Sequence, residues 1–524
     1  MVLTLEARVG QVMMCGFAGR DPELAKELIM NYHVGGIIYF SHNLNSVAEA
    51  AHMSHTMQEW ACLSPSGVPL FIATDQEGGT VARLTADTPR MPGAMALAAA
   101  SLGCKNKRLV RQVYYAMGRQ LRAAGINVDL APVLDINDNP HNPVIGVRSF
   151  GDDPQHVAAL GVEAVKGLTA AGVLAVGKHF PGHGNTATDS HFSLPVISRS
   201  LDELREIELI PFTAATAAGM QAVMTAHIVF EALDSQHPAT LSRIVLGDLL
   251  RKQLGFQGIV MSDCLEMSAI AQSLGSVRGA VQAIAAGVDM VLISHCKEIQ
   301  TKTFEALLSA VKSGELPERR LNEAVQRVLV VKKALGVPNP VALAEAKRPC
   351  FAELSRKTHL GSITVVRDRE GLIPLRPRTS QQGVKSDSRL RVLLAYGANL
   401  PGQNTLSSLT AYLTDSKEIE VTKIEVSTDR WQDSVDANQF DAVILLTHNL
   451  TVGVSQRAVA ADLVNLHTHT IVVALQDPQD MRAIPNVGTY VCTYGFRAES
   501  MKALSDVLRG DATATGCLPV KLRP

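Results

Sequence analysis

The sequence has no excess of charge of either sign and no long apolar run, and each absence excludes a class of partner. Its 524 residues include 49 Lys and Arg against 50 Asp and Glu, which gives a formal net charge of -1. Because nucleic-acid binding requires a basic face, we expect no nucleic-acid partner. No uninterrupted apolar stretch reaches the length of a membrane-spanning helix, so we expect no membrane partner.

Secretion and disulfide signals are also missing. The opening residues, "MVLTLEARVGQVMMCGFAG", lack the basic region that precedes the apolar part of a secretory signal. The eight cysteines form no CxxC pairs and are too sparse for a disulfide scaffold, which favours reduced thiols in a cytoplasmic protein. There is no GxGxxG motif, Walker loop or convincing internal repeat.

The pattern that is present indicates two domains, because single cores rarely exceed about 300 residues. In residues 1–335, eight short apolar runs alternate with helix-like segments, as in βα units. This pattern predicts a catalytic (β/α)8 barrel of the TIM type, with a doubly wound sheet as the alternative. The eight runs are "QVMMCGF" (11–17), "GGIIYF" (35–40), "LFIATD" (70–75), "NVDLAPV" (127–133), "LAVGKHF" (174–180), "AVMTAHI" (222–228), "IVMSD" (259–263) and "MVLIS" (290–294).

A second domain is expected after the barrel. The segment "GVPNPVALAEAKRPC" (336–350) contains three prolines, and we place a linker at 336–355. Residues 356–524 then read as a smaller layered α/β domain. Its predicted strands are "SITVVRD" (362–368), "LRVLLAYG" (390–397), "IEVTKIEV" (419–426), "DAVILLTH" (441–448) and "TIVVALQ" (470–476).

Polar clusters follow several of the barrel strands, where functional side chains of such barrels gather. Four charged clusters at one rim predict a shared active site, although a lone Asp263 would also suit a helix N-cap. The clusters are Asp75 with Gln76 and Glu77, Arg148 in "GVRSFGDD", the loop that follows "LAVG", and Asp263 at the end of "IVMSD".

The loop "GKHFPGHGNTATDSHFSLP" (177–195) is longer than the connection requires. Asp189 and His191 are one residue apart, so in a turn they can form an acid/base dyad; alternatively, Asp189 stabilises the turn and His191 is solvated. A metal site made of His179, His183 and His191 is disfavoured, because proline and glycine separate the first two. We expect the ring of His183 to hold the loop together by hydrogen bonds.

"KHFPGHGNTATDSHFSLP", with "TDQEGGTVARL" before it and "MSDCLEM" after it, resembles the bacterial β-N-acetylglucosaminidases of glycoside hydrolase family 3. The "LRGDATATGCLPV" ending resembles, more weakly, the C-terminal domain of the two-domain members. The resemblance implies that Asp263 is the nucleophile and that His191, with Asp189 as its partner, is the acid/base. It also implies sugar-binding roles, which fall on Asp75, Arg83, Arg148, Lys178 and His179.

The activity implied by the resemblance is a retaining exo-β-N-acetylglucosaminidase that acts on muropeptides or chitooligosaccharides and serves cell-wall recycling. Its partner is then a carbohydrate substrate, and no metal or other cofactor is expected, since side chains and water suffice. Three alternatives stay open: a phosphorylase, because a histidine acid does not repel phosphate; a β-glucosidase; and a silent sugar-binding protein. Thr80, Asn185 and Cys264 depart from the commonest family pattern, and the oligomeric state is not predicted.

Overall fold

The computed structural model describes residues 3–189, 194–336, 342–376, 389–397, 400–402, 404–426, 436–450, 454–466 and 469–522. It divides into two compact units, each treated separately below. The first comprises 1–89, 110–145 and 153–352, and the second comprises 90–109, 146–152 and 353–524. The domain boundaries expected from the sequence stay a prediction.

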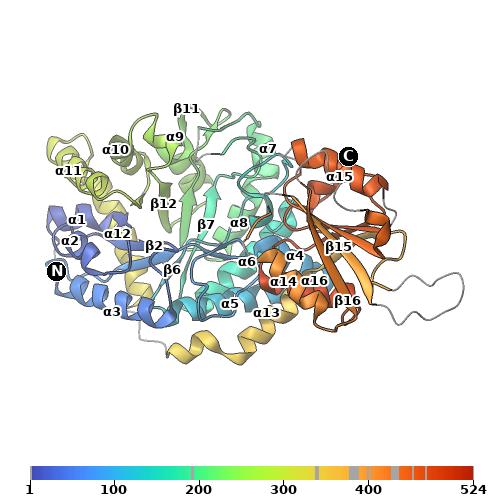
Figure 1. Ribbon diagram of the computed structural model, residues 1–524. Helices are drawn as coiled ribbons and strands as arrows, with labels where there is room; N and C mark the ends of the chain where they lie inside the picture. Colours follow the sequence, from blue (N-terminus) through green and yellow to red (C-terminus); the bar gives the residue numbers. More distant parts are fainter. Residues whose placement is uncertain are drawn as a thin grey trace, which may run out of the picture. The chain divides into compact units, whose positions relative to one another are not determined.

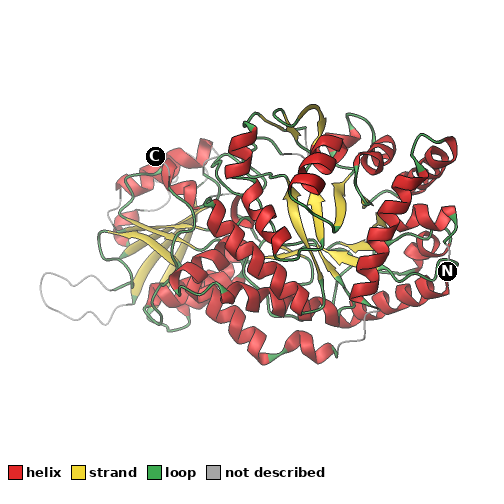
Figure 2. Ribbon diagram, turned by 180° about the vertical axis from the view of Figure 1, so that it is seen from behind, coloured by secondary structure: helices red, strands yellow, loops and turns green. Residues whose placement is uncertain are grey.

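The first unit contains a closed barrel of eight parallel strands, in the order β1-β13-β12-β9-β7-β6-β3-β2 (Figures 1 and 2). This confirms the predicted barrel, and each of the eight apolar runs overlaps one of its strands. The strands are β1 (Met13–Cys15), β2 (Gly36–Tyr39), β3 (Phe71–Thr74), β6 (Val128–Asp129), β7 (Leu174–Phe180), β9 (Ala222–Thr225), β12 (Ile259–Cys264) and β13 (Met290–Ile293).

Helices cover the outside of the barrel (Figure 2). The helical period of one of them, α5 (Arg108–Ala123), buries Val113, Tyr114 and Met117 on one face, as expected. Another, α7 (Leu201–Glu206), begins with the capping box of Ser200 and Glu203 that its sequence predicts. The others are α1 (Leu5–Gln11), α2 (Glu23–Met30), α3 (Val47–Leu63), α6 (Pro154–Ala170), α8 (Leu209–Ala217), the π-helix Ile244–Gln253, α9 (Ser268–Ala271), α10 (Ser276–Ala286), α11 (Lys297–Ser313) and α12 (Glu318–Leu335).

The barrel interior is filled by alternate residues of its strands. Ile38, Ala73, Val176 and Met261 belong to one buried apolar cluster that also includes residues of α12. Because side chains alternate along a strand, the residue two positions beyond each also points inward. At the ends of β2, β3, β7 and β12, those residues are Phe40, Asp75, Lys178 and Asp263.

Helix α12 carries a buried lysine at the amino-terminal end of the barrel. Lys332 Nζ donates to Gln11 Oε1 at 2.8 Å and lies 5.1 Å from the centre of the Phe71 ring. Burial holds the pKa of Lys332 well below its ordinary value.

The second unit is a six-stranded sheet in the order β14-β19-β18-β17-β15-β16, parallel except where β14 pairs with β19. Five of its strands were predicted, and β19 was not. The strands are β14 (Thr364–Asp368), β15 (Leu390–Tyr396), β16 (Ile419–Glu425), β17 (Ala442–Thr447), β18 (Thr470–Ala474) and β19 (Thr489–Cys492), with helices α13 (Pro349–Ser362), α14 (Thr405–Thr414), α15 (Val454–Leu466) and α16 (Ala498–Arg509).

A helix from the first third of the chain completes the second unit. In α4 (Ala94–Gly103), Met95 and Ala99 belong to a buried apolar cluster with side chains of the six-stranded sheet. Ala99 O accepts a hydrogen bond from Cys517 N at 3.1 Å. At Gly103 a Cβ atom would lie 2.0 Å from Thr515 O, so any larger residue would force the two segments apart.

Several short strands lie in the loops of the barrel. An antiparallel pair, β4 (Gln76–Gly78) and β5 (Val81–Ala82), follows β3 directly. Strands β8 (Val196–Ile197), β10 (Val229–Phe230) and β11 (Asp234–Pro238) form a separate sheet. None of the described helices combines the length and the apolar character needed to cross a lipid bilayer.

Candidate active site

The end of β7 places a buried lysine between two carboxylates. Lys178 Nζ lies 2.7 Å from Asp75 Oδ1 and 2.7 Å from Glu77 Oε1. The Lys178 side chain is 2 % exposed and that of Glu77 3 %, so the cation is almost removed from water. Since an unpaired buried charge is costly, the two carboxylates fix the ammonium group in one place.

A third carboxyl group, that of Asp129, lies close to this cluster. Asp129, at the end of β6, is fully buried; its Oδ1 accepts from Gln76 N at 3.0 Å, and its Oδ2 has no partner among the described residues. Burial raises the pKa of Asp129 well above its ordinary value, and the nearby Asp75 and Glu77 add to the effect.

The loop after β6 organises the two histidines of the β7 loop. Asp135 Oδ2 lies 2.7 Å from His179 Nδ1, and its Oδ1 accepts from the backbone N–H of His179 at 3.1 Å and of His183 at 2.7 Å. Burial favours the neutral acid, but the charges and hydrogen bonds of the two histidines prevail and hold the pKa of Asp135 below its ordinary value. Through Nδ1, Asp135 orients the His179 ring.

Asp263 is half-buried at the end of β12, and its Oδ1 accepts from Cys264 N at 2.7 Å. Burial favours its neutral form, but the imidazoles of His227 and His179, the Cys264 N–H and Lys178 hold its pKa below the ordinary value. It is therefore a carboxylate at neutral pH. Burial raises the pKa of the neighbouring Cys264 thiol to about 11, so this thiol stays neutral.

His227, two residues beyond β9, is fixed against the segment that carries Asp263. Its Nδ1 lies 2.8 Å from Thr240 Oγ1, and its Nε2 lies 3.1 Å from Cys264 O. The pairing of β9 with β12 brings the two strand ends together. With both ring nitrogens engaged, His227 is held beside the carboxylate.

The first half of the long β7 loop is anchored to the loop after β6. Asn142 Nδ2 donates to His183 O at 2.9 Å and to Gly184 O at 3.0 Å. At Gly184 a Cβ atom would lie 1.7 Å from Ile136 O, so this contact requires glycine. The His183 ring, at Nδ1, lies 3.1 Å from Thr186 Oγ1, the kind of loop-stabilising hydrogen bond that was expected of it.

Of the other predicted site residues, the structure describes Arg83, Arg148 and Asp189. Arg83 lies just past β5, and its Nε is buried without a partner among the described residues. Arg148 ends a short 3₁₀ helix, Gly146–Arg148, which groups with the second unit. Asp189 is half-buried, and His191 lies outside the described residues.

Two site residues were not predicted. Glu77 belongs to the polar cluster after β3, but its pairing with Lys178 depends on the β4–β5 hairpin, which no sequence motif predicts. His227 is a single histidine after an apolar run, a signal too common to single out. Asp135 follows the "NVDLAPV" run, and a carboxylate after a strand end was the available signal for it.

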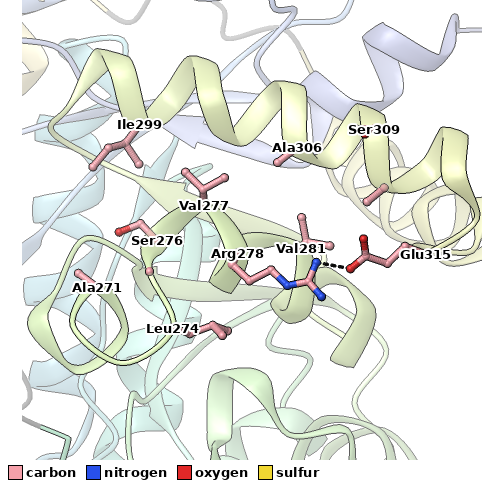
Figure 3. Close-up of a pocket in the computed structure, with 12 residues that line it drawn as sticks. Ala271, Leu274, Ser276, Val277, Arg278, Val281, Ile299, Ala306, Ser309 and Glu315 are labelled. Carbon is pink, nitrogen blue, oxygen red and sulfur yellow. Dashed lines mark hydrogen bonds and ion pairs between the residues drawn. The ribbon is translucent and has the colours of Figure 1, made fainter.

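A cavity lies outside the barrel mouth. A cavity of about 620 Å³ lies between α10 and α11 (Figure 3). Its lining is mostly small and apolar, and the ion pair of Arg278 with Glu315 crosses it. None of the predicted site residues lines it. Nor do three His, Cys, Asp or Glu side chains in the described ranges form a group that could hold a metal ion.

Comparison with known proteins gives a family for the barrel. Residues 4–331 match the family described as "Glycosyl hydrolase family 3 N terminal domain". Over 99 % of both chains, the structure is similar to a glycoside hydrolase family 3 β-N-acetylglucosaminidase from Paenibacillus sp. str. FPU-7, with 38 % sequence identity and a TM-score of 0.88.

Two relatives with curated names extend the comparison. β-Hexosaminidase A of Pseudoalteromonas piscicida is 36 % identical over 379 residues, which cover 68 % of this chain and 62 % of that protein. The chain thus spans less than two thirds of that relative. A β-N-acetylglucosaminidase/β-glucosidase of Cellulomonas fimi is 29 % identical over 98 % of this chain and 93 % of its own length.

Proposed function

The chain belongs to glycoside hydrolase family 3, and we propose that it is a retaining exo-β-N-acetylglucosaminidase that removes terminal N-acetylglucosamine from a β-linked substrate. The observation that carries the proposal is the ionised Asp263 at the barrel mouth, on the same inward-facing series of side chains as Asp75 and Lys178. An anionic nucleophile close to fixed hydrogen-bonding groups suits attack on a bound sugar.

In the proposed reaction Asp263 attacks the anomeric carbon and forms a covalent glycosyl-aspartate. His191 donates a proton to the leaving oxygen, with Asp189 orienting its ring and favouring the imidazolium. The neutral imidazole then removes a proton from water, which attacks the same carbon, so the anomeric configuration is retained. The low pKa of Asp263 supports its role, because a nucleophile must be ionised before substrate arrives.

Sugar recognition in this proposal uses Asp75, Lys178 and His179, together with Arg83 and Arg148. Lys178 and His179 are held by carboxylates before substrate binds, so little freedom is lost on binding. The unpartnered Nε of Arg83 offers a donor. N-acetylglucosamine is the sugar in the names of the Paenibacillus and Cellulomonas relatives. Muropeptides or chitooligosaccharides are the proposed substrates, and cell-wall recycling in the cytoplasm is the proposed setting.

The first test is turnover of aryl β-N-acetylglucosaminides by wild type, Asp263→Asn and His191→Ala. Asp263→Asn keeps the shape but removes the anion, so we expect kcat to fall at least about 10³-fold. His191→Ala should lose most with poor leaving groups, which need the proton. Asp248→Asn, on the outer π-helix, is the matched control. An Asp263→Asn enzyme that kept most of its activity while folded would refute the nucleophile.

The same assay separates the alternatives. The Cellulomonas relative carries both activities in its name, so kcat/KM for aryl glucoside is compared with that for aryl N-acetylglucosaminide. Acceleration by added phosphate, with a sugar phosphate as product, would establish a phosphorylase instead. Calorimetric sugar binding without turnover of any glycoside would establish a binding protein.

A further inference from the structure

Both ends of the segment that carries the proposed acid/base pair are bound to one carboxylate. Asp138 Oδ1 accepts a hydrogen bond from Asn185 Nδ2 at 3.2 Å, and Asp138 Oδ2 accepts one from Arg199 Nη2. The chain between Asn185 and Arg199 contains Asp189 and His191. We call Asn185, Asp138 and Arg199 the Asp138 clasp.

The first end of this segment is fixed to the loop that follows β6. Asn139, the neighbour of Asp138, donates from Nδ2 to Asn185 O at 3.0 Å. Asn185 is therefore held through its backbone by Asn139 and through its side chain by Asp138. Two residues earlier, His183 N donates to Asp135 Oδ1 at 2.7 Å, so the chain that leads to the clasp is anchored to the same loop.

The second end is fixed by an ion pair and by a short sheet. Arg199 Nη1 donates to Glu208 Oε1, at the start of α8. The Glu208 side chain is 2 % exposed and packs against Gly182, where a Cβ atom would lie 2.6 Å from Glu208 Cγ. Just before Arg199, Ile197 O accepts from Glu231 N at 3.1 Å, where β8 pairs with β10. Both ends of the segment are therefore held in place.

The geometry of a carboxylate makes the clasp a constraint on the loop. Its two oxygens are joined to one carbon, so the two donors that bind them must lie close together. Holding the ends of a loop together removes many of its conformations. A general acid needs this order, because a displacement of about 1 Å at a catalytic group can cost about 10²-fold in rate.

Asp138 is 8 % exposed and both of its oxygens are engaged, so it acts through the loop and not on the sugar. Resting on the proposed function, we propose that Asp138 is a positioning residue. By binding Asn185 and Arg199 together, it holds the segment that carries Asp189 and His191 in the position for proton transfer.

The test compares two leaving groups that differ in their need for a proton. Asp138→Asn keeps the size of the side chain but replaces one of the two acceptor oxygens by an NH2 group, so it cannot hold both donors as the carboxylate does. We expect kcat/KM for phenyl β-N-acetylglucosaminide to fall at least about tenfold, a part of the roughly 10²–10⁴-fold that a positioned acid contributes. Dinitrophenyl β-N-acetylglucosaminide releases a stable anion, so its kcat/KM should stay within about twofold of wild type.

His191→Ala is the reference, because it should show the same selectivity with a larger loss. Asn185→Ala leaves the pair of Asp138 and Arg199 intact, so it should show a smaller selective loss, and it guards against a folding defect in Asp138→Asn. Asp202→Asn, which removes an exposed carboxylate of the neighbouring helix α7, is the matched control and should change neither substrate. Equal losses for both leaving groups, or no loss for the phenyl glycoside, would overturn the inference.

Failure of the proposed function is recognised separately, by a His191→Ala variant that loses both substrates equally or by a wild type that turns over neither. Hydrogen exchange measured by mass spectrometry then tests the clasp without activity. The amides of residues 186–198 should exchange faster in Asp138→Asn than in wild type, and Asp202→Asn should match wild type. Unchanged exchange in Asp138→Asn would show that this carboxylate does not order the segment.

Discussion

At the scale of single residues, the site concentrates carboxyl groups and controls their charge by position. Asp75 and Glu77 share the Lys178 ammonium, two imidazoles hold the pKa of Asp135 below its ordinary value, and burial raises the pKa of Asp129 well above its ordinary value. These four acidic side chains at the barrel mouth therefore lie in different electrostatic surroundings.

The raised pKa of Asp129 predicts a pH effect on stability. Its pKa is raised in the folded protein, so between the ordinary value, about 3.9, and that raised value the folded state binds more protons than the unfolded state. The free energy of unfolding that Asp129 contributes therefore falls as pH rises. Asp129→Asn mimics the neutral acid and cannot titrate. Urea unfolding at a series of pH values above about 3.9 should show wild type losing stability relative to Asp129→Asn as pH rises, by at most about 1.4 kcal/mol per pH unit.

The exposed Asp248→Asn change serves as control, and its difference from wild type should not follow this trend. A difference between wild type and Asp129→Asn that stayed constant over this pH range would show that Asp129 is charged in the folded protein. The activity of Asp129→Asn is measured as a second test, because the asparagine Oδ1 can still accept the hydrogen bond from Gln76 N.

Residue patterns predicted polar side chains at the strand ends of the barrel, but not how those side chains pair. Asp75, Lys178 and Asp263 stand at or near the ends of apolar runs, and such polar residues at strand ends can be recognised in the amino-acid sequence. The pairing of carboxylates with cations depends on which strands are neighbours and on the β4–β5 hairpin. Neither can be read from the amino-acid sequence. His227 shows this best, because its place beside Asp263 comes from β9 pairing with β12.

At the scale of elements, the eight barrel strands were predictable because strands buried on both faces form nearly continuous apolar runs. β19 was missed because "TYVC" is short and half polar, a pattern shared with many loops. Its identity as a strand comes from its pairing with β14 and β18 on either side.

A buried cluster where β13 begins joins three elements. Asp289 Oδ1 lies 2.8 Å from an Arg320 nitrogen and 3.0 Å from Arg327 Nη1, and its Oδ2 lies 2.6 Å from Arg251 Nη2. Because Asp289→Ala leaves three half-buried cations without their anion, we expect it to cost about 3 kcal/mol of unfolding free energy, measured by urea denaturation. kcat of the folded enzyme should be unchanged, since the cluster is at the opposite end of the strands from Asp263.

The matched control is Asp248→Ala, which removes the exposed ion pair with Lys252. That change should cost under about 1 kcal/mol. A loss at Asp289 as small as the control's would mean that the arginines find water or other partners.

At the scale of the whole molecule, the two compact units do not divide the chain at one point. The segment 90–109 lies within the first third of the sequence, yet its helix α4 contributes to the core of the second unit. The sequence could not show this, because an apolar helix face indicates burial without naming the partner. Proximity along the chain suggested the barrel instead.

We therefore expect a chain cut after Leu335 to be defective, although the cut falls after the last barrel helix. It would leave the apolar face of α4 without its partners and expose Met95 and Ala99. Soluble yield and the thermal unfolding midpoint, compared with the full chain, measure the effect. The cut chain carrying Met95→Gln and Ala99→Lys should recover solubility. A soluble cut chain with the midpoint of the full protein would contradict the expectation.

The position of α4 also has a consequence for synthesis on the ribosome. α4 ends at Gly103, and the strand β15 of the sheet to which it contributes begins only at Leu390. At about 5 to 20 residues per second, this helix waits tens of seconds for its partners. During this time the barrel strands that precede and follow α4 in the sequence emerge from the ribosome and assemble. The nascent chain must therefore keep the apolar helix α4 apart from the barrel core, which is assembled from segments on both sides of α4 in the sequence. A chaperone that binds early and releases late is suited to this task.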